Sequence, residues 1–247
     1  MPEFACDLHI HSVLSPCGSL DMSPRVIVQK AREARLDIIA VTDHNMTENA
    51  PYVKELGERT GLIVLSGMEL QTREEIHLLA VFDEYDRARE LQSMVYDLLP
   101  EIPNDTEFWG DQAVVDTEDN IVRMEDRLLI NSADISIEDA ASWIKAHGGL
   151  AIASHIDSTT FSIISQLGFI PEHIELDALE VRNIDTAGEF APFIMKRGIP
   201  FVTFSDAHYP DDIGRRRTLL TMDIPGCAGI EKALKALGEK NVTAGQG

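Results

Sequence analysis

Short hydrophobic runs alternate with amphipathic stretches along most of the 247-residue chain. One run ends in His9 and His11, and seven more lie at residues 37–44, 61–70, 75–82, 149–156, 177–183, 199–208 and 216–223. Most of these runs are nearly continuous, as in strands buried on both faces. Hydrophobic residues recur with the spacing of an amphipathic helix at residues 23–36, 47–61, 136–149, 186–198 and 228–240. These stretches often have Ser, Thr or Asn near the start and Gly near the end. This alternation predicts an α/β fold with a largely parallel sheet, either a closed barrel or a doubly wound layer.

Residues 84–135 depart from this rhythm. They contain one helical stretch, then the polar segment PNDTEFWGD, then two short strand-like runs around the turn TEDN. We therefore expect residues 1–83 and 136–247 to form the main domain, and residues 84–135 to form an insertion or cap.

Polar residues gather where the predicted strands end. They are His9 and His11 after the first strand, Asp43 and His44 after the second, Glu69 after the third, His155 after GLAIAS, and Asp206 and His208 after IPFVTFS. The carboxyl ends of parallel strands meet at one face of a barrel, so these side chains are expected to converge there. A tight hairpin at TREE would bring His77 toward Glu69. Residues two apart on a strand point to the same side, which places His9 beside His11 and Asp206 beside His208.

Each of these features alone has an ordinary structural explanation. A His-x-His pair at a strand end is often only hydrogen-bonded, and TDH and SDAH are both compatible with turns in which Asp caps the backbone. His77 alone fits a satisfied sheet residue. Together, however, the imidazole and carboxylate groups match the ligands of divalent metal ions. His147 and His173 fall outside the pattern and are assigned no catalytic role.

Composition limits the partners. The 42 acidic and 21 basic residues give a formal charge of −21, which repels long nucleic acids and anionic membranes and favours metal cations. Three cysteines without paired spacing argue against a disulfide framework. No apolar run reaches membrane-spanning length and the start MPEFACDLH lacks the features of an export signal, so a cytoplasmic location is expected.

The motifs DLHIHS, AVTDHN, GMEL, IHLLAVF, ASH and SDAH, spread over residues 4–82 and 136–223, resemble the PHP (polymerase and histidinol phosphatase) phosphoesterases. The resemblance implies a distorted seven-stranded barrel with two or three divalent ions, Zn, Mn or Fe. It assigns His9, His11, Glu69 and Asp206 to one ion, with Glu69 bridging to a second ion held by His77 and His155. It assigns His44 and His208 to a third, together with a residue of the loop SVLSPCG.

Two departures from the family pattern bear on this assignment. Cys17 is the best-placed ligand in that loop, where many members have His or Asp, and a thiolate would favour Zn or Fe over Mn. The alternative is that Cys17 is a small buried hydrophobic residue. Many relatives also have Pro after the histidine of ASH, whereas this chain continues HIDS.

The function that follows is hydrolysis of a small phosphate ester, such as a nucleotide, sugar phosphate or amino-alcohol phosphate, by a metal-activated hydroxide. Glu69, Asp206 and His208 carry the expected catalytic roles, His208 by helping to protonate the leaving group. Asp7 and Asp43 are expected to orient ligand histidines. Arg215, Arg216 and Arg217 are the leading candidates for binding substrate phosphate, although each of these charges could instead pair with a nearby acid. Arg182, Arg123 and Arg127 are weaker candidates.

Three other functions remain open. A nuclease acting on nucleotides or short oligonucleotide ends fits the same metal ligands. An amidohydrolase-type enzyme also opens with His-x-His, but often uses a lysine at a strand end, which this chain lacks. A non-catalytic domain of the same fold would have no need to keep a near-complete ligand set. The sequence does not fix the oligomeric state.

Overall fold

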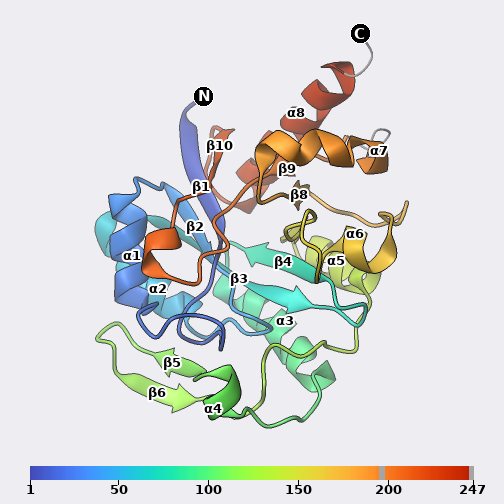
Figure 1. Cartoon of the computed structure of the whole chain (residues 1–247). Helices are drawn as coiled ribbons and strands as arrows, with labels where there is room; N and C mark the ends of the chain where they lie inside the picture. Colours follow the sequence, from blue (N-terminus) through green and yellow to red (C-terminus); the bar gives the residue numbers. More distant parts are fainter. Residues whose placement is uncertain (195–197, 245–247) are drawn as a thin grey trace.

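The computed structural model describes residues 1–194 and 198–244, and its centre is a mixed sheet (Figure 1). In the described residues the sheet has eight strands in the order β10-β1-β2-β3-β4-β7-β8-β9. Their bounds are β1 Glu3–Ile10, β2 Ile38–Val41, β3 Ile63–Gln71, β4 His77–Phe82, β7 Leu150–Ala153, β8 Ala178–Glu180, β9 Phe201–Val202 and β10 Thr218–Thr221. The pairs β1–β2, β2–β3, β7–β8 and β8–β9 are parallel, whereas β4 runs antiparallel to both of its neighbours and β10 antiparallel to β1.

The segment after β9 brings the two sides of the sheet together. The backbone of Ala207 pairs with β1, accepting from His11 N at 3.0 Å and donating to His9 O at 3.2 Å. The sheet is therefore nearly closed and barrel-like, which confirms the expected α/β class. Its eight strands match the eight hydrophobic runs, one more than the seven implied by the family resemblance. The last strand of this sheet along the chain, β10, lies beside the amino-terminal half of β1.

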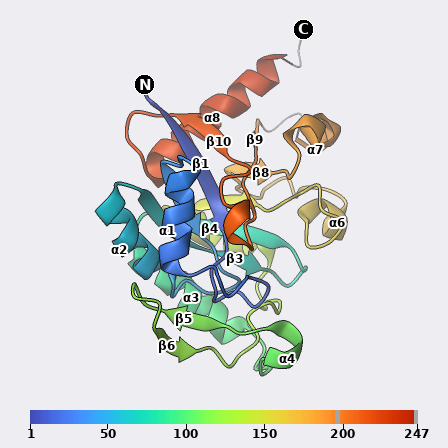
Figure 2. The same ribbon diagram turned by 60° about the vertical axis from the view of Figure 1, so that its left-hand side comes forward.

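Helices cover the outside of this sheet (Figures 1 and 2). They are α1 Pro24–Glu33, α2 Ala50–Thr60, α3 Tyr85–Leu98, α5 Ile137–Ala146, α6 Ile163–Leu167, α7 Ala191–Ile194 and α8 Cys227–Ala244, with the 3-10 turns η1 Ile184–Phe190 and η2 Pro210–Asp212. Ser23 and Ser136 cap α1 and α5, and Gly61 ends α2 with φ +72°, as the sequence pattern predicted. The helix expected at 186–198 is a 3-10 turn followed by α7, and part of it lies outside the described residues. None of the described helices has the length and apolar content needed to cross a membrane.

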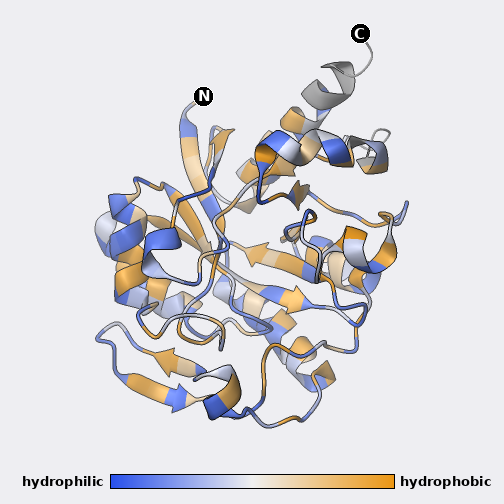
Figure 3. Ribbon diagram, viewed as in Figure 1, coloured by the Kyte–Doolittle hydropathy of each residue, from blue (hydrophilic) through white to orange (hydrophobic). Residues whose placement is uncertain are grey.

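The strands of the sheet contain long apolar stretches, coloured orange in Figure 3, and their alternate residues form the apolar interior. Leu65 on β3, Leu79 and Val81 on β4, and Ala178 on β8 belong to one buried cluster, which α8 closes through Ile230 and Leu234. The intervening residues pack outward against the surrounding helices. Each strand thus presents alternate residues to the interior, and this determines where the polar residues at its end will point.

Residues 84–135 contain the elements that the pattern predicted. After α3 come the short helix α4 Thr106–Trp109 and the hairpin β5 Ala113–Val115 and β6 Ile121–Met124. In Figures 1 and 2 the hairpin and α4 lie at the opposite end of the molecule from α8 and the amino terminus. Ala113 N donates to Val13 O at 3.1 Å, and the Asn45 side chain donates to Leu129 O at 2.6 Å. The segment therefore packs on the loops that follow β1 and β2.

Candidate metal centre

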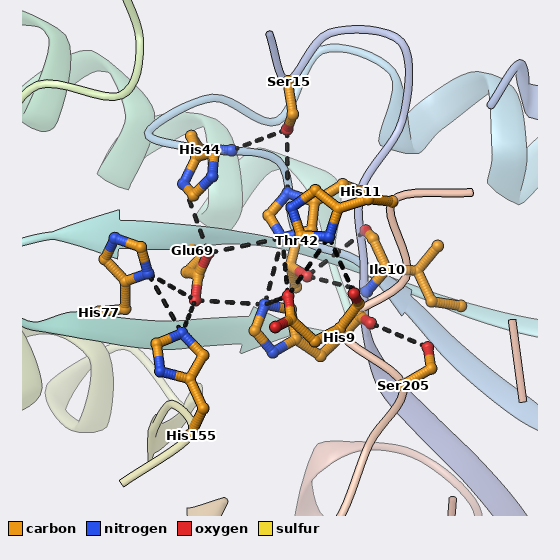
Figure 4. A network of polar contacts seen from close by, with 12 residues as sticks. His9, Ile10, His11, Ser15, Thr42, His44, Glu69, His77, His155 and Ser205 are labelled. Atoms are coloured by element: carbon orange, nitrogen blue, oxygen red, sulfur yellow. Dashed lines mark hydrogen bonds and ion pairs between the residues drawn. The ribbon is translucent and has the colours of Figure 1, made fainter. Parts of the chain in front are cut away.

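Five histidines surround the carboxylate of Glu69 (Figure 4). Oε1 of Glu69 lies 3.0 Å from His77 Nδ1 and 3.2 Å from both His9 Nε2 and His155 Nε2. Oε2 lies 3.3 Å from His44 Nδ1 and 3.4 Å from His11 Nε2. Glu69 is 1% exposed, so these contacts form in a dry environment.

Strand alternation explains why these groups meet. Glu69 lies four residues after Leu65 on β3, and His77 lies two residues before Leu79 on β4, so each shares the inward-facing side of its strand. The antiparallel register pairs Gln71 with His77, which brings the end of β3 next to the start of β4 as the predicted hairpin required. The polar residues continue the inward-facing rows of the apolar interior at one end of the barrel.

Asp206 and His208 complete the cluster from the segment after β9. Asp206 Oδ1 lies 3.4 Å from His9 Nε2 and 3.6 Å from His11 Nε2. His208 Nδ1 lies 2.9 Å from the Asp206 carbonyl oxygen. Asp206 and His155 have φ +51° and φ +26°, in the left-handed region that costs energy for residues other than glycine. Such backbone conformations at a cluster of polar groups are typical of functional sites.

The residues present fit divalent metal ions. Three groups hold ligand atoms that lie within 4.8 Å of one another: His9, His11 and Asp206; His44, Glu69 and His77; and His11, Cys17, His44 and His208. Among the described residues, His44 Nδ1 and Glu69 Oε1 are buried and have ion-pair contacts within the cluster but no well-aligned hydrogen bond, an arrangement that suits a further bound species. The nitrogen and oxygen donors suit Zn, Mn or Fe, and the one sulfur donor favours Zn or Fe. The structure brings together all nine expected ligands. It groups His44 with Glu69 and His77, whereas the family resemblance assigned His44 to a different ion. The assignment of ligands to individual ions stays a prediction.

The electrostatics of the cluster also suit cations. Burial lowers the pKa of His9, but Glu180 and Glu69 outweigh it and hold that pKa well above the usual value. Burial is likewise outweighed at His11, where Asp206 and Glu69 raise the pKa to about 9. Burial and the neighbouring His11 lower the pKa of His208 to about 4 and that of His44 well below its usual value. Without metal, the carboxylates would retain protons on some rings, and these protons occupy the positions where cations would bind.

Cys17 lies at the mouth of this cluster. The residue is exposed, yet its sulfur is within 4.8 Å of nitrogens of His11, His44 and His208 and lines the same cavity. This geometry argues against the alternative of a buried hydrophobic residue. Although the residue reaches solvent, its thiol is largely enclosed at the cavity, and this enclosure together with the nearby Glu69 raises the Cys17 pKa. A cation would therefore be needed to hold it as the thiolate.

Glu180, at the end of β8, was missed by the sequence reasoning. It is 1% exposed, and its Oε2 lies 2.9 Å from His9 Nδ1 and 3.2 Å from the backbone nitrogen of His155. Ser15 occupies a similar place beside His11, with its Oγ 3.0 Å from Nδ1. A partner on Nδ1 fixes the ring tautomer and leaves Nε2 facing the centre. An isolated glutamate in DALEVRN was the available signal, because it follows Ala178 on the inward-facing side of its strand.

Asp7 and Asp43 do not contact histidine rings as expected. Asp7 accepts from the backbone nitrogens of Ser205 and Gly214, both at 2.9 Å. Asp43 accepts from the Ser12 and Ser15 hydroxyls, both at 2.6 Å. Asp43 therefore reaches His11 only through Ser15, and Asp7 supports the backbone next to Asp206. The prediction of direct contact is wrong because Asp7 faces the backbone of neighbouring loops and Asp43 faces the two serines that follow β1.

The three arginines that follow SDAH, Arg215 to Arg217, do not line the cavity at the metal ligands. Arg215 pairs with Asp212 at 2.7 Å, and Arg217 donates to Ala34 O at 2.7 Å. Arg216 donates to the carbonyls of Phe204 at 2.8 Å and Ser205 at 2.5 Å, just before Asp206. These contacts correct the expectation that Arg215 to Arg217 bind substrate. Arg123 pairs with Glu48, which precedes α2, at 2.7 Å and with Glu125 at 2.9 Å, and Arg127 donates to Tyr96 O on α3 at 2.6 Å, at a different cavity.

Arg182 is the arginine that reaches the centre. Its Nη2 lies 3.6 Å from Asp206 Oδ2, and it lines a cavity of about 250 Å³ above the cluster. Among the described residues that line this cavity, Arg182 is the only lysine or arginine. His147, in contrast, stacks on Trp143 with ring centroids 3.7 Å apart, outside the cavity, in keeping with no catalytic role.

The architecture is similar to solved structures of two kinds. The lesion-specific endonuclease PfuEndoQ from Pyrococcus furiosus superposes with a TM-score of 0.71 at 18% identity, covering 96% of this chain but 56% of that one. A putative metal-dependent phosphoesterase from Bifidobacterium adolescentis superposes with a TM-score of 0.59 at 18% identity, covering 93% of this chain and 95% of that one. The chain thus spans little more than half of the endonuclease, and at these identities the likeness shows the fold alone.

Two curated proteins are similar in sequence. An uncharacterized protein of Methanocaldococcus jannaschii is 26% identical over 185 residues, 72% of this chain and 80% of its own. A 5'-3' exoribonuclease of Salmonella typhimurium is 35% identical over 80 residues, 30% of this chain and 26% of that protein. The second similarity covers a minor part of both proteins.

The family is established over most of the chain. The PHP domain matches residues 7–162, and a PHP-associated segment matches residues 189–237. The first match contains seven of the nine expected ligands, and Asp206 and His208 lie within the second. The chain therefore belongs to the PHP domain family and is a PHP-type metal-dependent hydrolase.

Proposed function

We propose that the chain is a metal-dependent phosphoesterase that hydrolyses a phosphate ester of a small molecule. One observation carries the proposal: six histidines, Glu69 and Asp206 converge at the base of a cavity of about 250 Å³ that Arg182 also lines. A phosphoryl group needs concentrated positive charge around its oxygens, and this cluster of ligands beside an arginine can supply it.

The proposed ligand sets follow the cluster. His9, His11, Glu69 and Asp206 would hold one ion, Glu69, His77 and His155 a second, and His44, His208 and Cys17 a third. When bound, two or three divalent ions supply Lewis-acid stabilisation of phosphoryl oxygens and lower the pKa of a water.

The protein's own residues orient the reacting groups. Glu180 and Ser15 hold Nδ1 of His9 and His11, so that each Nε2 faces the centre. Arg182 lies where its guanidinium can bind a phosphate oxygen beside Asp206. His208 directs Nδ1 to a carbonyl oxygen, so its neutral ring donates there and presents an unprotonated Nε2. That tautomer suits a metal ligand better than a proton donor, so we propose that His208 acts as a ligand and does not protonate the leaving group.

Cavity size and charge favour a small substrate. The cavity of about 250 Å³ is slightly smaller than the range of about 300–1,000 Å³ for ligand sites, and the chain's charge of −21 opposes a long polyanion. A second candidate is cleavage at the end of a short oligonucleotide. The fold shared with PfuEndoQ and the partial sequence similarity to the Salmonella exoribonuclease support that alternative.

We also propose that the insertion selects the leaving group. Ile130, from residues 84–135, lines the cavity beside the metal ligands. The segment rests on the loop that carries Ser15 and Cys17 through the Ala113–Val13 hydrogen bond. Binding loops carried by a rigid scaffold often determine specificity in this way.

The test is a screen of the purified protein after chelation and reloading with Mn, Zn or Fe. Substrates would include nucleotides, sugar phosphates, a generic phosphodiester and single-stranded oligonucleotides. We expect phosphate release from a small ester that depends on the reloaded metal. Oligonucleotide cleavage with a higher kcat/KM than any small ester would favour the second candidate. A metal-loaded protein that cleaves no phosphate ester would reject both.

A further inference from the structure

Phe161 is an aromatic residue held in an unusual position at the cavity. Its ring lies parallel to that of His77, with centroids 4.8 Å apart and an interplanar angle of 6°. It lines the same cavity as the metal ligands and is 38% exposed. A large apolar side chain in that position leaves ring surface facing solvent beside the metal cluster, which is a cost unless a ligand covers it.

The backbone fixes this ring in place. Phe161 has φ +57°, a left-handed conformation that is unfavourable for a bulky residue. Its carbonyl oxygen accepts from His77 N at 2.9 Å, the Ser162 hydroxyl donates to Ser158 O at 2.8 Å, and Ser158 N donates to His155 O at 2.7 Å. These bonds connect the loop to two of the candidate metal ligands. The ring is thus pre-positioned, and a ligand would lose little free energy in ordering it.

The other cavity residues define what could lie against this ring. Ile130 supplies a second apolar surface, Ser158 and Thr160 offer polar groups, and Arg182 offers a cation next to Asp206. A ligand that satisfies all of them has a phosphate at the metal cluster and a planar, partly polar ring further out. The cavity of about 250 Å³ leaves room for little beyond one such unit.

We propose that Phe161 is a stacking platform for the nucleobase of the leaving group, and that the substrate is a nucleotide. This inference rests on the proposed phosphoesterase function and deepens it by naming the substrate class. Aromatic side chains can stack on the π-face of any base. The platform would therefore favour substrates that carry a base over those that lack one, without distinguishing between different bases. The nucleotide could be free or could be the terminal unit of a short oligonucleotide, since both present the same ring and phosphate.

The test compares adenosine 5'-monophosphate with ribose 5-phosphate, which lacks the base. We expect the wild-type protein to prefer the nucleotide in kcat/KM, and Phe161→Ala to reduce that ratio about 5- to 150-fold, the range for loss of one base–aromatic stack. Phe161→Tyr keeps a planar ring and should retain most of the preference. Phe169→Ala is the matched control, because Phe169 is 57% exposed and outside the cavity lining. Removing the Phe161 ring also exposes His77, which could change the activity toward both substrates. The ratio of the two kcat/KM values cancels such a shared change.

The outcomes separate the platform from the phosphoesterase function. An equal kcat/KM for the two substrates in the wild type, or a ratio unchanged in Phe161→Ala, would overturn the platform even if both esters are cleaved. If neither ester is cleaved, the binding affinities of the same two molecules for metal-loaded protein are measured by calorimetry. Tighter binding of the nucleotide that is lost in Phe161→Ala supports the platform without the hydrolysis. Equal affinities for the two molecules in the wild type reject the platform. A 5'-phosphorylated trinucleotide, run in parallel, distinguishes a terminal nucleotide from a free one.

Discussion

The candidate metal centre has a buried floor and an exposed rim, and the two are built differently. The floor consists of His9, His11, Glu69 and Glu180, which are at most 1% exposed and come from strands or from the residue directly after a strand. The rim consists of Cys17, Phe161, Arg182 and His208, which are partly or largely exposed and come from loops. Strand register fixes the floor, whereas loop conformation fixes the rim. We therefore expect floor substitutions to remove metal binding. Rim substitutions should alter substrate use or, at Cys17 and His208, the third ion alone.

The largest effect is expected for Glu69→Gln. The amide has the same size but lacks the charge that five imidazoles share, so more than one metal equivalent should be lost together with phosphate release. The loss should exceed about 100-fold, the upper range for removal of an outer partner of a metal ligand. Metal content and phosphate release are the measurements, with the exposed Glu58→Gln as control. Full turnover in the Glu69 variant would remove the bridging role.

Glu180→Gln tests whether the floor extends beyond the ligands. The carboxylate contacts His9 Nδ1 at 2.9 Å and would strengthen that ring as a ligand. We expect metal affinity to fall about 10- to 100-fold while the fold is retained, as measured by competition with a chelator. Glu172→Gln, on an exposed residue before β8, is the matched control. Equal affinities in the two variants would make Glu180 a structural residue only.

Most of the floor was predictable from sequence, and the rim was not. His9, Glu69 and Asp206 follow apolar runs, so the convergence of strand ends at one face was enough to group them. Glu180 was missed because its role depends on His9, 171 residues away, and no local pattern reports that contact. Arg216 was misassigned because its place in a loop does not fix its direction, and its guanidinium turns back to the Phe204 and Ser205 carbonyls. The eighth strand, β10, was visible in the hydrophobic pattern although the family resemblance implied seven strands.

The floor should also make the metal-free protein sensitive to pH. Despite burial, Asp206 and Glu69 raise the His11 pKa to about 9, from about 6.5 in the unfolded chain. This raised pKa stabilises the fold fully below about pH 6.5, and the stabilisation is lost as the pH rises through about 9. We expect the unfolding free energy of chelated protein to fall by up to about 3 kcal/mol over that window, measured by denaturant titration. Metal-loaded protein is the control, because bound cations replace these protons; a parallel decline in both forms would contradict the charge arrangement.

Cys17 tests the boundary between floor and rim. If its sulfur binds the third ion with His44 and His208, Cys17→Ser should lower the metal content by one equivalent and leave the ions around Glu69. Cys17→Asp should restore the equivalent with a shift toward Mn, because a carboxylate is the harder ligand. Cys227→Ser controls for loss of a thiol away from the cavity. An unchanged metal count in Cys17→Ser would leave two ions as the working centre.

Arg182 should give the smallest effect and the clearest rim behaviour. Its guanidinium is 48% exposed and lies 3.6 Å from Asp206 Oδ2, so a bond to substrate phosphate would be charge-assisted but partly screened by solvent. Arg182→Ala should therefore raise KM about 10-fold, equivalent to about 1.4 kcal/mol, with metal content and kcat nearly unchanged. Arg215→Ala is the matched control, since that side chain pairs with Asp212 and does not line the cavity. A loss of metal in Arg182→Ala would instead mean that this arginine supports Asp206 and belongs with the floor, and equal KM values in the two variants would remove it from substrate binding.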